Sequence, residues 1–140
     1  MYPDLRNLLN SAKIISFKFN NIVPDNYKDL IDLPGVGDYT AKAILGIGYN
    51  KSVMPVDANI KRMLARLYGL DQSINLINKK ITSLSQFYAS KKQSSNLIQA
   101  FMDYGSIICV PRNPRCGICI IAKECIANQK KNNKHYSKKK

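Results

Sequence analysis

Apolar residues recur at intervals of three and four through most of this chain, and the strict alternation typical of β-strands is nearly absent. Residues 3–17 open with Pro3 and Asp4, which favour a helix start, and they predict one amphipathic helix. Its apolar face consists of Leu5, Leu8, Leu9, Ala12 and Ile15. Five further helices are predicted over residues 26–33, 38–48, 57–69, 73–88 and 94–109. The pattern therefore predicts an all-α fold.

Two aspartates are candidate N-caps of these helices. Asp25 stands directly before residues 26–33, and Asp57 opens residues 57–69, which end at Gly69. An aspartate that opens a helix is far more often a cap than a catalytic residue, so Asp57 alone supports only the structural interpretation.

All four cysteines lie within residues 109–125, in the spacing C-x6-C-x2-C-x5-C. This spacing predicts a coordinated metal centre, with Cys109, Cys116, Cys119 and Cys125 as its ligands. Disulfides are disfavoured because nothing marks the chain as secreted. Zinc stays open as an alternative, but structural zinc usually takes two short C-x-x-C pairs. The wider spacings on both sides of Cys116 and Cys119 favour an iron–sulfur cluster.

The chain is strongly basic, with a formal net charge of +13 over 140 residues. Six of the lysines lie in residues 128–140, so that +7 remains for residues 1–127. Such a charge favours a polyanionic partner, most often nucleic acid, although a solvated surface that only aids solubility is the alternative. The length excludes a large multidomain enzyme, and no apolar stretch approaches the roughly 20 residues of a membrane helix. We therefore expect a cytoplasmic protein with no membrane partner.

The segment "LPGVGDY" is a candidate anion-binding turn. Pro34 stiffens its entry, while Gly35 and Gly37 allow backbone angles at which successive N–H groups face outward. The helix that follows adds its positive N-terminal end, and Lys42 lies within its first turns. The alternative is a Pro-Gly-x-Gly turn that joins two helices and binds nothing.

Three motifs in order, "LPGVGDYTAKAIL", "PVDANIKRMLARLYGL" and the cysteine loop, together resemble the endonuclease III and MutY type DNA glycosylases of the helix-hairpin-helix superfamily. They extend from Leu33 to Cys125 and cover most of the chain. The resemblance implies the helix-hairpin-helix DNA glycosylase fold, with a partial six-helix barrel lobe and an iron–sulfur lobe. Its expected boundaries are 1–55 for the barrel lobe with the hairpin at 33–45, 56–128 for the cluster lobe with the cluster loop at 109–125, and 129–140 for a basic tail.

The same resemblance assigns roles to individual residues. The four cysteines would hold a 4Fe–4S cluster. Asp57 would face the deoxyribose of a flipped nucleotide and stabilise the sugar cation as the N-glycosidic bond breaks. Double-stranded DNA would be bound by Leu33, Pro34, Gly35, Val36, Gly37, Lys42, Arg112 and Arg115.

Tyr39 favours a monofunctional enzyme, because the bifunctional branch of the family has at this position a lysine whose amine attacks the sugar. We expect removal of adenine mispaired with guanine or 8-oxoguanine. Ala58, where the adenine branch more usually has glycine, leaves thymine mismatch glycosylases open. An endonuclease III-like glycosylase, a DNA-binding remnant without catalysis, and an iron–sulfur or zinc module without a DNA role are further alternatives.

One catalytic part of the adenine branch has no counterpart here. MutY-type enzymes carry on an early helix a glutamate that protonates adenine, whereas Glu124 in the cysteine loop is the one glutamate of this sequence. The resemblance thus predicts a central fragment that also lacks the C-terminal domain for 8-oxoguanine recognition. Its activity would need a separately encoded N-terminal half, and it would otherwise be a monomer, in a bacterial cytoplasm and associated with the nucleoid through DNA.

Overall fold

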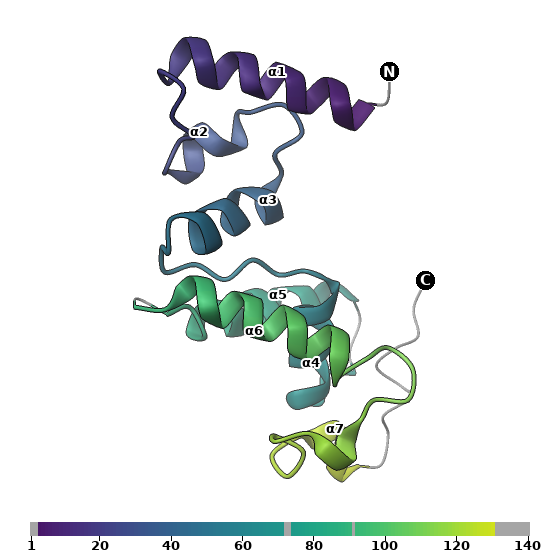
Figure 1. Cartoon of the computed structure of the whole chain (residues 1–140). Helices are drawn as coiled ribbons and strands as arrows, with labels where there is room; N and C mark the ends of the chain where they lie inside the picture. The colour runs from purple at the N-terminus through teal and green to yellow at the C-terminus, as the bar shows by residue number, and fades with distance from the viewer. Residues whose placement is uncertain (1–2, 72–73, 91, 131–140) are drawn as a thin grey trace.

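A computed structural model describes residues 3–71, 74–90 and 92–130, and the chain is helical with no strand in those ranges (Figure 1). The all-α prediction is confirmed. The basic tail predicted for 129–140 lies, apart from its first two residues, outside the described residues. The elements are α1 (Pro3–Lys18), α2 (Tyr27–Ile31), α3 (Asp38–Ala43), the π-helix η1 (Ile44–Gly48), α4 (Ala58–Leu67), α5 (Ile74–Phe87), α6 (Ser94–Ile107), the 3₁₀ turn η2 (Cys116–Ile118) and α7 (Ile126–Gln129).

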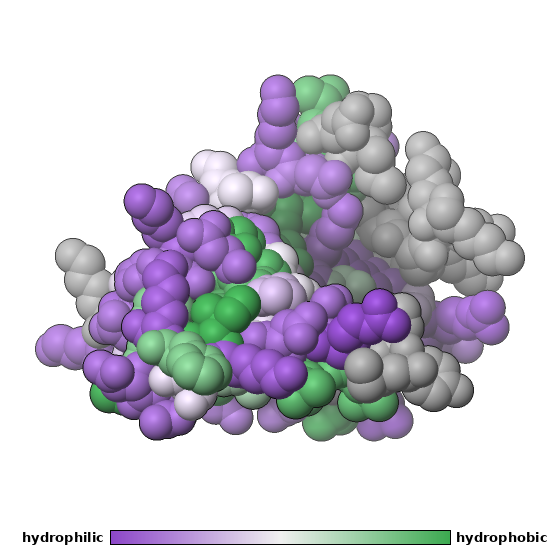
Figure 2. Space-filling model, turned by 90° about the horizontal axis from the view of Figure 1, so that it is seen from above, coloured by the Kyte–Doolittle hydropathy of each residue, from purple (hydrophilic) through white to green (hydrophobic). Residues whose placement is uncertain are grey.

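Helix α1 has the predicted amphipathic pattern, but much of its apolar face is uncovered. Leu5, Leu8 and Leu9 are 57%, 68% and 47% exposed. Only further along the helix do Ile14 and Ile15 pack against a core cluster. Figure 2, which views the molecule from the α1 side, shows apolar patches among the polar side chains of this face. The apolar pattern predicted the helix correctly, but it did not predict that much of the apolar face is exposed.

The first core cluster joins α2, α3, η1 and the turn between α2 and α3. Its buried residues are Leu30, Leu33, Ala41 and Leu45. One predicted cap in this region is wrong: Asn26, not Asp25, caps α2, and its side chain accepts a hydrogen bond from the Asp29 N–H at 3.0 Å. Asp25 instead pairs with Lys51, 26 residues away, at 2.8 Å. A contact distant in sequence thus takes the carboxylate that a local pattern assigned to the helix.

The second core cluster lies in the lower part of Figure 1, between α4, α5 and α6. It is built around Ile60, Leu64, Ile81 and Ile98, each at most 1% exposed. An extended segment after η1 leads to α4, and α6 also packs on η1. Gly46 permits that packing, because a Cβ there would clash with the end of the Ile98 side chain. The predicted lobe boundary at residue 55 stays a prediction.

None of the helices in the described ranges is long and apolar enough to span a membrane.

Candidate functional site

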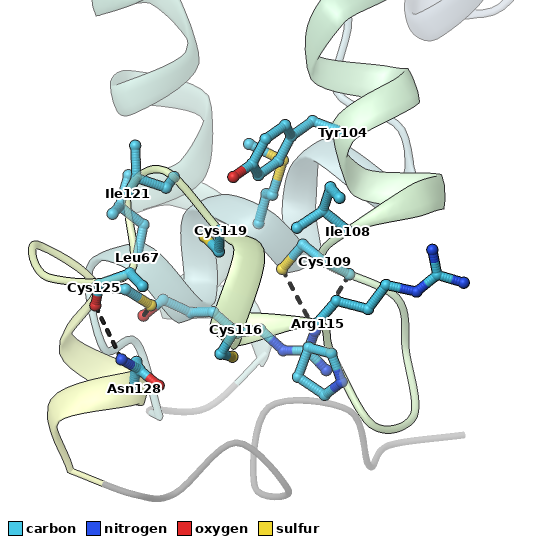
Figure 3. Close-up of a pocket in the computed structure, with 14 residues that line it drawn as sticks. Leu67, Tyr104, Ile108, Cys109, Arg115, Cys116, Cys119, Ile121, Cys125 and Asn128 are labelled. Atoms are coloured by element: carbon cyan, nitrogen blue, oxygen red, sulfur yellow. Dashed lines mark hydrogen bonds between the residues drawn. The ribbon is translucent and has the colours of Figure 1, made fainter.

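The four cysteines line a single cavity between α4, the end of α6 and the cysteine loop (Figure 3). Its empty volume is about 430 Å³, including solvent at its mouth. Side chains from α4 and α6 complete the wall, among them Met63, Leu67 and Tyr104, together with Ile108, the C-cap residue of α6. No disulfide joins the cysteines, and within the described residues no three His, Cys, Asp or Glu side chains are arranged to hold a single metal ion. The loop places four soft donors around one largely apolar space.

Arg66 of α4 is a buried charged residue in the wall of this cavity. It is 2% exposed, and its guanidinium donates to the carbonyls of Cys109, Val110 and Pro111 at 3.1, 2.7 and 2.8 Å. Its Nη1 also lies 3.4 Å from the Cys109 Sγ. Its Nε has no hydrogen-bond partner in the described part of the chain. A buried cation with an unused donor beside cysteine sulfur fits an anionic iron–sulfur cluster.

A second arginine connects the cysteine loop to Asp57. Arg62 donates from Nε to the Cys109 carbonyl at 2.8 Å and from Nη2 to the Gly105 carbonyl at 2.6 Å. The same Nη2 donates to the Asn59 side-chain oxygen at 2.7 Å, and the Asn59 amide donates to Asp57 Oδ2 at 3.2 Å. Burial lowers the pKa of Arg62, and Arg66 lowers it further, while Cys109 and Asp57 oppose this shift. The side chains of Arg62 and Asn59 therefore link the Cys109 carbonyl of the loop to the candidate catalytic carboxylate of Asp57.

Asp57 is the N-cap of α4, as the pattern predicted, and it is half-buried. Its Oδ1 accepts a hydrogen bond from the Ile60 N–H at 2.7 Å. Burial raises the pKa of the Tyr39 hydroxyl in α3, and the negative charge of the Asp57 carboxylate raises it further. Tyr39 is 42% exposed, so it is accessible to a ligand. The two residues predicted to be catalytic thus interact electrostatically, and their roles stay predictions.

The candidate anion-binding turn has one constrained glycine, not two. Gly35 has φ +80°, and a Cβ there would also come within 2.8 Å of the Asn7 Cβ. Gly37 is the N-cap of α3 with φ −94°, an extended conformation that any residue adopts, so the prediction of an unusual backbone at Gly37 is wrong. A Cβ at Gly37 would meet nothing within 4 Å. The protein itself therefore does not require glycine at this position, which faces open space.

Lys42 already has a partner in the structure. Its Nζ lies 2.8 Å from Asp38 Oδ1, and the Tyr27 hydroxyl donates to the same oxygen at 2.9 Å. Hydrogen bonding to Lys42 lowers the pKa of Asp38, burial opposes the shift and Tyr27 adds to it. A phosphate at this turn would have to compete with Asp38 for the lysine, so the DNA contact of Lys42 stays a prediction.

Arg112 and Arg115 lie in the stretch between Cys109 and Cys116, and both are exposed. Their side chains are thus accessible to a duplex beside the cavity, and DNA binding by them stays a prediction. Leu33 is buried in the first core cluster at 4% exposure, while Pro34 and Val36 are half-buried. Leu33 can reach DNA only through its backbone.

Three residues of the site were not predicted from the sequence: Asn59, Arg62 and Arg66. The sequence did contain a signal for the two arginines. They stand four positions apart in a helix that also carries Met63 and Leu67, and they therefore lie close to residues expected to be buried. A charged residue at a core position is seldom buried without hydrogen-bond partners. The pattern therefore indicated a buried polar contact, although not with which segment.

Comparison with known families matches two parts of this chain. Residues 18–47 match the helix-hairpin-helix motif. Residues 109–125 match the iron-sulfur binding domain of endonuclease III. The second match covers all four cysteines, so the cofactor of the cavity is a 4Fe–4S cluster, and Cys109, Cys116, Cys119 and Cys125 are the residues that would hold it.

Several curated proteins resemble the chain along most of its length. An adenine DNA glycosylase of Buchnera aphidicola subsp. Baizongia pistaciae is 38% identical over 96% of this chain and 41% of its own length. The human adenine DNA glycosylase is 35% identical over 92% of this chain and 24% of its own length. A thymine/uracil-DNA glycosylase of Methanothermobacter thermautotrophicus is 32% identical over 81% of this chain and 52% of its own length. The chain spans about two fifths of the Buchnera relative.

Solved structures show the same fold. A thermostable thymine-DNA glycosylase superposes with a TM-score of 0.81 at 31% identity, over 89% of this chain and 58% of the other. A trapped endonuclease III–DNA covalent intermediate superposes with a TM-score of 0.70 at 24% identity, over 90% of this chain and 58% of the other. The predicted helix-hairpin-helix glycosylase fold is confirmed.

Proposed function

We propose that this chain, which belongs to the helix-hairpin-helix and endonuclease III superfamily, is the part of a base-excision-repair adenine DNA glycosylase that grips duplex DNA and supplies the sugar-facing carboxylate. The substrate would be adenine mispaired with guanine or 8-oxoguanine. The observation that carries the proposal is the placement of Asp57 at the start of α4, as a half-buried carboxylate linked by hydrogen bonds through Asn59 and Arg62 to the cysteine loop.

Asp57 would act on the sugar. As the bond between adenine and deoxyribose breaks, positive charge develops on the sugar ring, and an oriented carboxylate nearby stabilises that charge. The Ile60 N–H and the Asn59 amide each hold one oxygen of Asp57, so the carboxylate needs little reorganisation when the charge appears. Water would then attack the sugar cation, which completes hydrolysis.

Tyr39 supports the assignment as a monofunctional glycosylase. A strand-cleaving enzyme needs an amine that attacks the sugar and forms a Schiff base. Tyr39 has a phenol whose pKa is raised by burial and by Asp57, so it is neutral at physiological pH and offers neither an amine nor a phenolate. The amine of Lys42, one turn further along, is paired with Asp38.

The cluster would support DNA binding rather than the chemical step. When bound, it supplies cross-links between four points of the loop, which Arg62 and Arg66 already tie to α4. This holds Arg112 and Arg115 at the surface beside the cavity, where they would contact phosphates. The turn at Gly35 to Gly37, whose open side has room for a ligand, would provide a second phosphate contact.

The proposal includes a partner polypeptide on α1. Protonation of the leaving adenine needs a carboxylic acid near the base. Asp38 is paired with Lys42, and Asp103 and Glu124 are exposed on α6 and in the cysteine loop. A separately supplied segment, equivalent to the part of the adenine glycosylases that this chain does not match, would bring the acid. The exposed Leu5, Leu8 and Leu9 are apolar surface of the kind that such a segment would cover.

A complementation assay tests the proposal. The partner is the segment of the Buchnera aphidicola adenine DNA glycosylase that precedes its match to this chain, and the substrate is duplex DNA with adenine opposite 8-oxoguanine. We expect the chain alone to bind the duplex in a salt-sensitive manner and to release no adenine, and the mixture to release it. A Leu8→Asp variant should keep the fold of the chain, because Leu8 is 68% exposed, but lose complementation. Adenine release by the chain alone contradicts the proposal that the partner segment supplies the acid for the leaving adenine.

Thymine mismatch repair is a second candidate, favoured by the superposition on a thymine-DNA glycosylase with a TM-score of 0.81. The same mixture, given duplex DNA with thymine opposite guanine, decides between the two substrates. Release of thymine without release of adenine favours this candidate.

A further inference from the structure

Tyr104 lies on the wall of the cysteine cavity, in α6 and one turn before Cys109 (Figure 3). Its ring extends over the cavity, and the hydroxyl points toward the segment that carries Cys119. The backbone N–H of Ile120, the residue after Cys119, donates to the Tyr104 hydroxyl oxygen at 2.9 Å. The helix and the cysteine loop are thus joined at this hydroxyl.

The hydroxyl proton has an acceptor on the same side. A phenol has one proton to donate and can accept as well. The Ile120 N–H occupies an acceptor position of the oxygen, and both Tyr104 and Cys119 line the same cavity. Burial raises the pKa of the Tyr104 hydroxyl, and hydrogen bonding to Cys119 raises it further. A phenol is neutral at physiological pH, so the proton is available to a thiolate sulfur.

We infer that Tyr104 is a positioning residue for the cluster: it donates a hydrogen bond to the Cys119 thiolate and thereby raises the reduction potential of the 4Fe–4S cluster. Hydrogen bonds to the sulfurs of an iron–sulfur cluster are among the factors that set its potential. A donor withdraws negative charge from the sulfur, and this stabilises the reduced cluster, which carries one more electron, over the oxidised one. The inference concerns the cofactor alone and does not require the proposed glycosylase activity.

The test is the midpoint potential of the one-electron couple, measured at an electrode on the cluster-loaded full chain. Tyr104→Phe keeps the ring in the wall of the cavity and removes only the hydroxyl. We expect a shift to a more negative potential, with the visible absorbance per chain unchanged. Tyr88→Phe is the matched control, because it also removes a tyrosine hydroxyl, one that pairs at 2.6 Å with Tyr68 rather than with the loop, and its potential should equal that of the unmodified chain.

A second measurement keeps the test decisive if Tyr104→Phe does not retain its cluster. The unmodified chain is produced with 3-fluorotyrosine, whose hydroxyl is a stronger donor, and its potential should become more positive. The same labelling of Tyr88→Phe should give the same shift, because Tyr104 is still present. Equal potentials in the Tyr104→Phe variant and the unmodified chain, or no shift on fluorination, overturn the inference. A chain that holds no cluster overturns it together with the cofactor assignment.

Discussion

Replacing Arg66 by methionine should strongly destabilise the cysteine loop, because the guanidinium of Arg66 binds backbone carbonyls at the start of this loop. The guanidinium is 2% exposed and donates to three consecutive carbonyls, those of Cys109, Val110 and Pro111. Methionine has a similar reach and fills the space, but it donates no hydrogen bond. The Val110 and Pro111 carbonyls then lose their donor, and the Cys109 carbonyl keeps only Arg62, at the point where α6 leads into the loop.

The expected cost follows from those three contacts. A buried group left without its hydrogen-bond partner costs about 1–3 kcal/mol, and a bond from a charged donor lies toward the upper end. Pro111 is exposed, so water can satisfy its carbonyl in part. We therefore expect a loss of about 3–5 kcal/mol in the free energy of unfolding. A single domain has a free energy of unfolding of roughly 5–15 kcal/mol, so the variant should lose a large share of its stability.

Urea unfolding of the cluster-loaded chain, followed by circular dichroism and by visible absorbance, measures this effect. Arg115→Met is the matched control in the same loop, where the side chain is exposed, and it should unfold within about 0.5 kcal/mol of the unmodified chain. Arg66→Lys, which keeps the charge but not the planar fork, should fall between the two. The reasoning is refuted if Arg66→Met retains its cluster and unfolds as Arg115→Met does.

Three further predictions concern other parts of the molecule. Borohydride should trap no covalent adduct between the complemented chain and damaged DNA, because Tyr39 offers no amine; adducts in the yield of a lyase contradict this. Replacing Arg112 and Arg115 together by alanine should weaken duplex binding and reduce the slope of log affinity against log salt by up to about 1.8, or about 0.9 for each lost phosphate contact; an unchanged slope assigns them to solubility. Burial and the Tyr68 hydroxyl raise the pKa of Tyr88 to about 12, so the folded state favours the neutral phenol. Its stabilisation is full below about pH 10 and is lost as the pH rises through 12, and Tyr88→Phe should lose less stability over that interval in thermal unfolding; equal losses contradict the prediction.

The sequence predicted the parts of the structure that depend on local spacing. Helical periodicity placed α4 and α6 correctly, and the cysteine spacing placed four thiols around one cavity. Each of these features is encoded within a few turns of helix or a short loop. The same holds for the Asp57 cap, whose bond to the Ile60 N–H spans three residues.

The features that were missed depend on contacts distant in sequence. Arg66 is buried because the loop that begins 43 residues later presents three carbonyls to it, and no local pattern specifies that meeting. Asp25 was expected to cap α2, but Lys51 competes for its carboxylate. The π-helix at Ile44–Gly48 follows α3 without a break in the apolar pattern, so the periodicity of the sequence did not distinguish it from an α-helix.

The central claim, that Asp57 stabilises the sugar while adenine leaves, is tested most directly by single-turnover adenine release from the complemented chain. Asp57→Asn preserves the shape of the side chain and an oxygen that can accept the Ile60 N–H at the helix cap, so the variant should fold and bind the duplex. The negative charge is removed. We predict a loss in the rate of adenine release of at least about 100-fold, as expected when a single electrostatic stabiliser of the transition state is removed, with duplex affinity nearly unchanged. Release at the rate of the unmodified chain would show that the carboxylate is only a helix cap.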